Sequence, residues 1–252
     1  MSSRNANRRS LKRRSPLQVE RLEDRSLLSS LSISDVTVVE GNAGPGSVNA
    51  VFTVTLTRTD ALTVTVDAAS ADGTATSPSD YTAFPTTTLT FINGGPLTQT
   101  VTVTVNGDTL DELDETFFVN LTNATNATIT DPLGLGTIVD DDTTAVTLSV
   151  SPATLAETGG TSTVTATLSA ISGQNVIVDL AYSGTATNLS DYTRSSTQIV
   201  IPAGSLTGTV TLTALPDLLN ETNETIVVDI SAVTNGTEVV PQQVTEIGRA
   251  HV

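Results

Sequence analysis

The sequence predicts an all-β protein built from two consecutive immunoglobulin-like β-sandwiches. Apolar and polar residues alternate along short segments, most clearly where Val101, Val103 and Val105 share one face and threonines occupy the other. Aromatic residues make up 3% of the chain and Trp is absent, whereas Val, Thr, Leu and Ala are abundant. β-Branched residues with few large rings suit the thin core between two sheets. Motifs also recur at a long, nearly constant spacing, which indicates that a whole domain is repeated.

The repeat aligns the two halves of the chain. Gly-Thr-Ala-Thr at 73–76 recurs at 184–187, an offset of 111 residues. Leu-Thr-x-Thr-Val-Thr at 97–102 recurs at 206–211, an offset of 109. The two-residue difference falls between these motifs, where a surface loop can absorb a change in length. A spacing of this size corresponds to two complete domains and not to a solenoid of small repeats.

Each repeat is expected to contain about seven strands. In the first repeat the alternating runs lie at 33–40, 48–58, 62–70, 87–92, 98–106, 116–122 and 134–140. The gaps contain turn-forming residues, such as Gly-Asn-Ala-Gly-Pro-Gly at 41–46 and Asn-Gly-Gly-Pro at 93–96. No segment with a helical period competes with this interpretation. Short alternating strands separated by such turns favour an immunoglobulin-like sandwich.

Composition and charge exclude several classes of function. The chain has 11 Lys+Arg and 27 Asp+Glu, a formal net charge of −16. Residues 1–30 hold eight of the basic residues, so the remainder is acidic apart from Arg58, Arg194 and Arg249. A body of this charge is unsuited to nucleic acid and suited to divalent cations. The absence of Cys excludes disulfides and thiolate metal sites, and no apolar run approaches the ~20 residues of a transmembrane segment.

Residues 1–30 form a basic, polar segment without periodicity, which predicts a disordered arm. Within it, Val-Glu-Arg-Leu-Glu-Asp-Arg-Ser-Leu-Leu-Ser at 19–29 resembles the planctomycete extracellular motif, whose core is Leu-Glu-Asp-Arg-x-Leu-Leu. This resemblance implies an export or targeting role for the arm and an extracellular or cell-surface location for the protein.

The last six residues, Ile-Gly-Arg-Ala-His-Val at 247–252, correspond to the translation of a common sequencing-library adapter, and we interpret them as an artefact. We therefore assign no function to His251, the only histidine. The expected organisation is the basic segment 1–30, a first domain at 31–142, a second, C-terminally truncated domain at 143–246, and the artefact 247–252.

Four motifs give the first repeat a clear resemblance to the Calx-beta domain family. They are Val-Glu-Gly at 39–41, Asp-Gly-Thr-Ala-Thr-Ser-Pro-Ser-Asp-Tyr at 72–81, the acidic run 108–117 and Thr-Ile-Val-Asp-Asp-Asp at 137–142. The resemblance covers about 33–142, and a weaker one covers about 146–246. It implies a tandem of calcium-binding β-sandwiches.

The resemblance also implies a calcium site at one end of each sandwich. In the first domain it indicates Glu40, Asp80, Asp108, Glu112, Glu115, Asp140, Asp141 and Asp142 as ligands. In the second it indicates, more weakly, Glu157, Asp191, Asp217, Glu221 and Glu224. Gly107 departs from the family pattern, since calcium-binding relatives often have Asp there, and this departure puts one ion in doubt. The second domain lacks the terminal Asp triplet.

The residues themselves are consistent with calcium. Calcium binds six to eight oxygens, several of them from loop carboxylates. Carboxylates that converge without Lys or Arg repel one another unless cations neutralise them, and the first domain contains only Arg58. Other roles stay open for each acid taken singly: a turn former, a solvated linker or a soluble edge. Tyr81 and Tyr192 are expected to pack in the cores.

The sequence favours a structural or binding module over an enzyme. There is no Cys and no Trp, and the single His lies in the segment interpreted as an artefact, so neither a nucleophilic triad nor an aromatic sugar cleft is indicated. Two functions remain. In the first, calcium stiffens the tandem from a hinged pair into a rod, as part of a larger surface protein. In the second, an adhesion module with little calcium dependence binds carbohydrate or protein, contacting polysaccharide or other cell-surface proteins through Phe84 or the Phe117-Phe118 pair.

Overall fold

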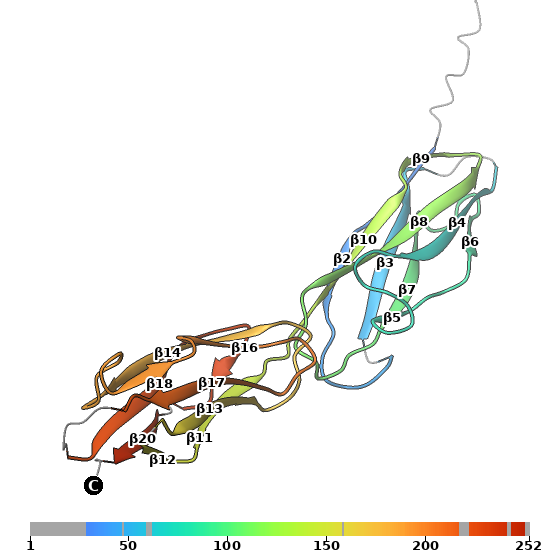
Figure 1. Cartoon of the computed structure of the whole chain (residues 1–252). Coiled ribbons are helices and arrows are strands. Elements are labelled where there is room, and N and C mark those ends of the chain that lie inside the picture. The colour runs from blue at the N-terminus through green and yellow to red at the C-terminus, as the bar shows by residue number, and fades with distance from the viewer. Residues whose placement is uncertain are drawn as a thin grey trace, which may run out of the picture.

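The structure, a computed structural model, describes residues 29–46, 48–58, 62–157, 159–216, 222–240 and 243–249. Within these ranges all regular secondary structure is β, and the strands form two domains arranged end to end (Figure 1). No described helix could cross a membrane. The predicted arm lies outside the described residues except for its last two positions, as do Asp217, Glu221 and His251.

Domain 1 is a sandwich of two five-stranded sheets, with the orders β5-β7-β3-β1-β9 and β2-β10-β8-β4-β6. Its strands are β1 (Ser30–Ile33), β2 (Val36–Val39), β3 (Val48–Leu56), β4 (Val64–Asp72), β5 (Tyr81–Thr82), β6 (Thr87–Phe91), β7 (Thr98–Val105), β8 (Glu115–Thr125), β9 (Thr128–Asp131) and β10 (Leu133–Val139).

Domain 2 repeats this topology strand for strand, with the orders β15-β17-β13-β11-β19 and β12-β20-β18-β14-β16. Its strands are β11 (Ala145–Ser151), β12 (Thr154–Ala156), β13 (Thr161–Leu168), β14 (Val176–Gly184), β15 (Tyr192–Arg194), β16 (Gln198–Ile201), β17 (Thr207–Ala214), β18 (Glu224–Thr234), β19 (Thr237–Glu238) and β20 (Gln243–Arg249). The prediction of two tandem immunoglobulin-like sandwiches is confirmed. Strand β20 includes three residues of the segment interpreted as adapter-derived, and that interpretation stays a prediction.

The first predicted strand, 33–40, is wrong in one respect, because the chain divides it between two sheets. Strand β1 pairs with β3, whereas β2 pairs in parallel with β10 in the opposite sheet. Ser34 and Asp35 make the crossing. The Ser34 hydroxyl accepts a hydrogen bond from the Thr53 amide at 3.0 Å, and the Asp35 carboxylate accepts one from the Leu135 amide at 2.8 Å. Each crossing residue is therefore held by a different sheet.

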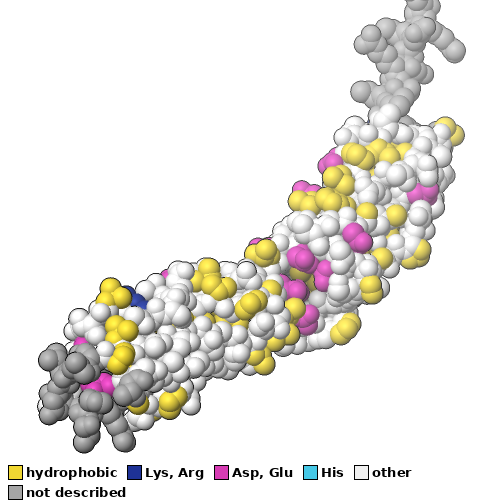
Figure 2. Space-filling model, in the orientation of Figure 1, with side chains coloured by type: hydrophobic (Ala, Val, Ile, Leu, Met, Phe, Trp, Pro, Cys, Tyr) yellow, Lys and Arg dark blue, Asp and Glu magenta, His cyan; other side chains and the backbone are white. Residues whose placement is uncertain are grey.

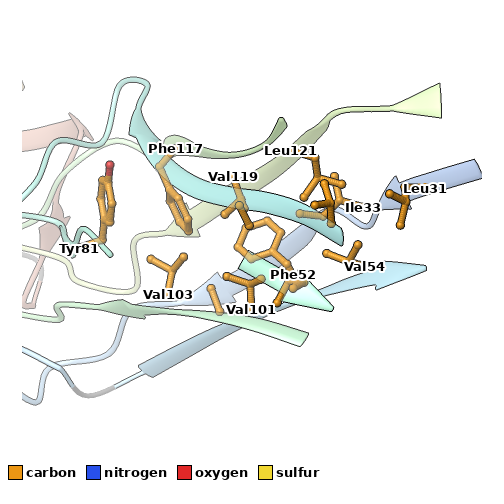
Figure 3. Close-up of a cluster of buried hydrophobic side chains, with 14 of the residues drawn as sticks. Leu31, Ile33, Phe52, Val54, Tyr81, Val101, Val103, Phe117, Val119 and Leu121 are labelled. Atoms are coloured by element: carbon orange, nitrogen blue, oxygen red, sulfur yellow. The ribbon is translucent and has the colours of Figure 1, made fainter. Parts of the chain in front are cut away.

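The core of domain 1 follows the predicted alternation, and its aromatic residues lie between the sheets (Figure 3). Phe117 packs edge-on against Phe52, with ring centroids 5.8 Å apart, and stacks on Tyr81 at 4.8 Å. Tyr81 and Tyr192 are both buried, which confirms their expected packing roles. A side chain at Gly136 would lie 2.4 Å from the Phe117 ring, so only glycine lets the ring fit against β10.

Replacing Phe117 by Ala is expected to destabilise domain 1 by ~3–5 kcal/mol, because it leaves a cavity where three rings meet. This is a large share of the ~5–15 kcal/mol that stabilises an ordinary domain. Denaturant unfolding of the full chain measures the change. Phe118→Ala is the matched control, since Phe118 faces the other side of β8 and is only half-buried. Equal losses for the two variants would contradict this assignment of the core.

Candidate metal centre

The acidic residues predicted as ligands in domain 1 gather at the pole that faces domain 2. Glu40 follows the end of β2, Asp80 precedes β5, Asp108 follows β7, and Glu115 begins β8. The triplet 140–142 follows β10, which runs parallel to β2 and antiparallel to β8. These strand directions bring all of the segments to one end of the sandwich. Figure 2 shows the resulting group of acidic side chains near the middle of the molecule.

Three of these residues approach closely enough to share one ion. Glu40, Asp108 and Asp142 each offer a carboxylate oxygen, and the three oxygens lie within 4.8 Å of one another. Glu40 is buried, with 6% of its surface exposed, whereas Asp108 is exposed and Asp142 is half-buried. The group therefore extends from the protein interior to the surface, which gives an ion a route of entry.

The electrostatic cost of this arrangement is visible in the pKa values. Burial, followed by the charges of Asp108 and Asp140, raises the pKa of Glu40 to about 8. Burial and neighbouring Asp80 raise the pKa of Glu115 to about 7. The pKa of Glu112 is also raised, first by burial and then by Asp108 and Asp80. Glu112 is thus electrostatically coupled to two pairs of acids, Glu40 with Asp108 and Glu115 with Asp80.

Two carboxylate oxygens in the terminal triplet have no protein partner. Asp140 Oδ1 and Asp142 Oδ2 are buried, and neither has a hydrogen-bond partner among the described residues. A buried acceptor without a partner loses its hydration without compensation, and the loss is larger for a charged group. A cation would supply what these oxygens lack. The residues present therefore fit a hard divalent ion bound through oxygen.

Other members of the constellation are fixed by hydrogen bonds. Asp141 Oδ1 accepts from the Gly41 amide at 2.9 Å, and Asp142 Oδ1 accepts from the Asn42 side chain at 2.5 Å. These bonds tie the triplet to the turn after β2. Asp80 Oδ2 accepts from the Thr76 amide at 2.6 Å. Asp141 and Asp142 thus hold the exit of domain 1 against the turn after β2, and Asp140 and Asp142 each keep one carboxylate oxygen without a hydrogen-bond partner among the described residues. A ligand role for Asp141 stays a prediction.

Gly107 has a steric role. A side chain there would lie 1.8 Å from the Gly41 carbonyl oxygen and 2.5 Å from that of Glu40, so no other residue fits without moving the backbone. The strand end after β7 therefore lies directly against the turn that carries Glu40. This close packing brings two ligand-bearing segments together. Whether the departure from the family pattern at Gly107 costs an ion stays a prediction.

Sequence reasoning missed two residues that position the site. Asn106 is buried, accepts a hydrogen bond from Gly46, and donates to the carbonyls of Pro78 and Ser79 at 2.8 and 2.9 Å. It thereby fixes the loop that carries Asp80. Asp72 accepts from the Tyr81 hydroxyl at 2.6 Å. The sequence signal for this role was the polar residue Asn106 directly after the alternating strand.

Domain 2 places its described counterparts on the same elements. Glu157 follows β12, Asp191 precedes β15, and Glu224 begins β18, each half-buried. Asp191 Oδ2 accepts from the Thr187 amide at 2.6 Å, as Asp80 does from Thr76. Among the described part of domain 2, however, no three acids converge as they do in domain 1. The weaker site predicted there stays a prediction.

The chain is thus a tandem of two β-sandwich domains of one topology, with a group of acidic residues at the pole of domain 1 that faces domain 2. The Calx-beta domain model matches residues 28–138 and again 140–249, so the chain belongs to the Calx-beta family. This confirms the family and the two copies predicted from the sequence. No curated protein matches the chain closely enough to count as a relative.

Solved structures with similarity to the chain include Calx domains. The crystal structure of CBD12 from CALX1.2 is 18% identical, covers 87% of this chain and 99% of its own, and has a TM-score of 0.41. The calcium binding domain CBD12 of CALX1.1 has the same identity and coverage with a TM-score of 0.39. The apo-form Calx CBD1 domain is 24% identical, covers 46% of this chain and 99% of its own, and has a TM-score of 0.39.

Proposed function

We propose that this protein is a non-enzymatic, calcium-binding structural or adhesive module of the cell surface, and that Ca²⁺ at the pole of domain 1 stiffens the tandem. The observation that carries the proposal is the convergence of Glu40, Asp108 and Asp142 oxygens within 4.8 Å, beside partnerless oxygens of Asp140 and Asp142. An extracellular location, export through segment 1–30 and a place in a larger surface protein are parts of the same proposal.

The donor set favours calcium over other biological ions. All candidate ligands are carboxylates, whereas zinc and copper prefer His or Cys, and the chain has no Cys and a single His at 251. Magnesium requires near-ideal octahedral geometry and retains several waters, while calcium accepts six to eight oxygens in irregular arrangements. Carboxylates that come from four separate loops suit calcium, because it tolerates irregular coordination geometry.

Stiffening follows from where the triplet lies in the chain. Residues 140–142 are at once part of the acidic pole and the exit from domain 1, and β11 of domain 2 begins at Ala145. A linker this short cannot act as a free coil. An ion bound by Asp140 and Asp142 together with Glu40 and Asp108 would fix the exit strand to the sandwich. Calcium would thereby set the angle between the domains.

Small-angle X-ray scattering of the full chain tests this mechanical role. With calcium, the scattering profile is expected to show a single, less flexible particle, and with a chelator a broader range of interdomain angles. The reason is that repulsion among the carboxylates loosens the junction when no cation is present. If the flexibility is identical in both conditions, calcium does not stiffen the tandem, even though both domains are folded.

Glu115→Gln is expected to weaken calcium binding about tenfold, equivalent to ~1.4 kcal/mol, because one charge is lost while the size of the side chain is kept. Calorimetric titration measures the dissociation constant. Asp131→Asn is the control, since Asp131 is exposed at the end of β9, at the far pole of the same domain (Figure 1). If both variants weaken binding equally, the acids form a diffuse field and not a site.

The alternative, a carbohydrate- or protein-binding adhesion module, gains no support from the aromatic residues considered for it. Phe117 is buried, Phe84 packs against the core of domain 1, and Phe118 is half-buried. No surface is therefore assigned to the binding of polysaccharide or of other cell-surface proteins.

A further inference from the structure

One member of the acidic run, Asp111, contacts the second domain. It forms a parallel bridge with Ser172, in the loop between β13 and β14. The Ser172 hydroxyl donates to Asp111 Oδ2 at 2.7 Å, and the Gly173 amide donates to the Asp111 carbonyl at 2.8 Å. The Gln174 side-chain amide donates to the Glu112 carbonyl at 2.9 Å. We propose that residues 172–174 form a latch for the acidic loop, and that Asp111 is a docking residue and not a metal ligand.

The Ser172 hydroxyl both donates and accepts a hydrogen bond. A hydroxyl has one hydrogen to donate and can accept through its lone pairs. Its short contact, 2.7 Å to the charged Oδ2, is the better donor bond than the 3.3 Å approach to the Asp111 carbonyl. The Ser172 hydroxyl oxygen also accepts a hydrogen bond from the backbone amide of Gln174 at 3.0 Å. Ser172 is 1% exposed and Asp111 8%, so water does not readily replace this pair.

The latch loop is held in shape by its own domain. The Gly204 amide donates to the Ser172 carbonyl at 2.8 Å, and the Ala203 amide donates to the Asn175 side chain at 2.9 Å. The Asn235 side chain donates to the Asn175 carbonyl at 3.0 Å. Two further loops of domain 2 therefore support the latch, and a rigid receptor loses little freedom when it binds.

The latch and the metal centre share one loop but use different atoms. In the hydrogen bonds that cross between the domains, the donors are uncharged groups of domain 2 and the acceptors belong to Asp111 or Glu112. Asp111 is absent from the group whose oxygens converge, which is formed by Glu40, Asp108 and Asp142. Given the proposed function, on which this step rests, calcium fastens the acidic loop to domain 1 and the latch fastens the same loop to domain 2. Both connections are needed to fix the interdomain angle.

Distance measurements between spin labels test the latch. The native chain has no Cys, so Thr100→Cys and Thr209→Cys introduce one label on the exposed face of each domain. In saturating calcium, the unmodified tandem is expected to give a narrow distribution of distances, and Ser172→Ala to broaden it about twofold or more while the calcium dissociation constant stays within about twofold. Gln174→Ala, which leaves the buried hydroxyl in place, is expected to broaden the distribution less. Ser205→Ala, in a neighbouring loop, is the control.

An unchanged distribution in Ser172→Ala would overturn the latch. A parallel loss of calcium affinity would also overturn it as a separate device, since the two connections would then be one unit. A failure of the proposed function would look different: the tandem without the Ser172 substitution would give the same distribution of distances with calcium and with chelator. Thermal unfolding of each variant confirms that both domains remain folded.

Discussion

Calcium added to metal-free protein is expected to raise the melting temperature of domain 1 by about 10 °C or more at a hundredfold excess over the dissociation constant. An ion that binds only the folded state contributes ~2.7 kcal/mol at that excess. Each kcal/mol shifts the melting temperature of a domain of this size by about 4 °C or more. The folded domain gathers the carboxylates of Glu40, Asp108 and Asp142, which the unfolded chain disperses, so the ion distinguishes the two states. Differential scanning calorimetry measures the shift.

Two comparisons assign that shift to the metal centre. Phe117→Ala is expected to lower the transition of domain 1 selectively, because Phe117 is buried in that core, and so to identify this transition in the calorimetric trace. Magnesium at the same concentration controls for general screening of the net charge of −16. Extracellular calcium modules have dissociation constants of roughly 10⁻⁴–10⁻³ M. A domain 1 transition that does not move between chelator and calcium at ~10⁻² M would remove calcium from the function.

In the absence of calcium, the melting temperature of domain 1 is expected to fall as the pH rises from about 5 to about 9. The folded state raises the pKa of Glu40 from 4.5 to about 8 and that of Glu115 from 4.5 to about 7. A carboxyl whose pKa is raised by folding holds its proton more tightly in the folded state. Its contribution to stability is fully present below pH 4.5, the unfolded value, and is lost as the pH rises through the folded value.

Calcium is expected to reverse this dependence, because the ion replaces the protons that neutralise the pole. Binding near pH 6 should release protons, and calorimetric titration in buffers of different ionisation enthalpy counts them. The number released should decline towards pH 9, where Glu40 and Glu115 are already ionised. A melting temperature in chelator that stays constant or increases over this range would contradict the raised pKa values.

Much of the fold could be predicted because the signal for it is local and repeated. Alternation in β7 (Thr98–Val105) and the recurrence of whole motifs identify strands and domains without knowledge of distant contacts. The split of the first strand could not be predicted in this way. Its two parts are both apolar and alternating, and only their partners, β3 in one sheet and β10 in the other, separate them. The short strand β5 likewise exists through its pairing with β7.

The candidate site was predicted largely through the family resemblance. The residues of the acidic run that contact the second domain could not be predicted in this way. The resemblance indicated Asp108, which converges with Glu40, and left out Asp111, but nothing in acid identity or spacing indicated that Asp111 contacts Ser172 of the other domain. The role of Asp111 depends on the position of a loop 61 residues further along the chain. The role of Gly107 was also hidden, because the backbone against which it packs belongs to the turn at Gly41.

The parallel pairing of the second and last strands in each sandwich has an expected consequence for the response of the tandem to tension. In domain 1, Val36–Val39 of β2 lies in register with 136–139 of β10, and in domain 2 β12 pairs in parallel with β20. Pulling the two ends of the chain apart draws such a pair in opposite directions along the strand axes. The hydrogen bonds between the strands then share the load, whereas strands peeled from a sheet lose their bonds one after another. A chain anchored at one end and pulled at the other would therefore yield only when a whole ladder is sheared at once.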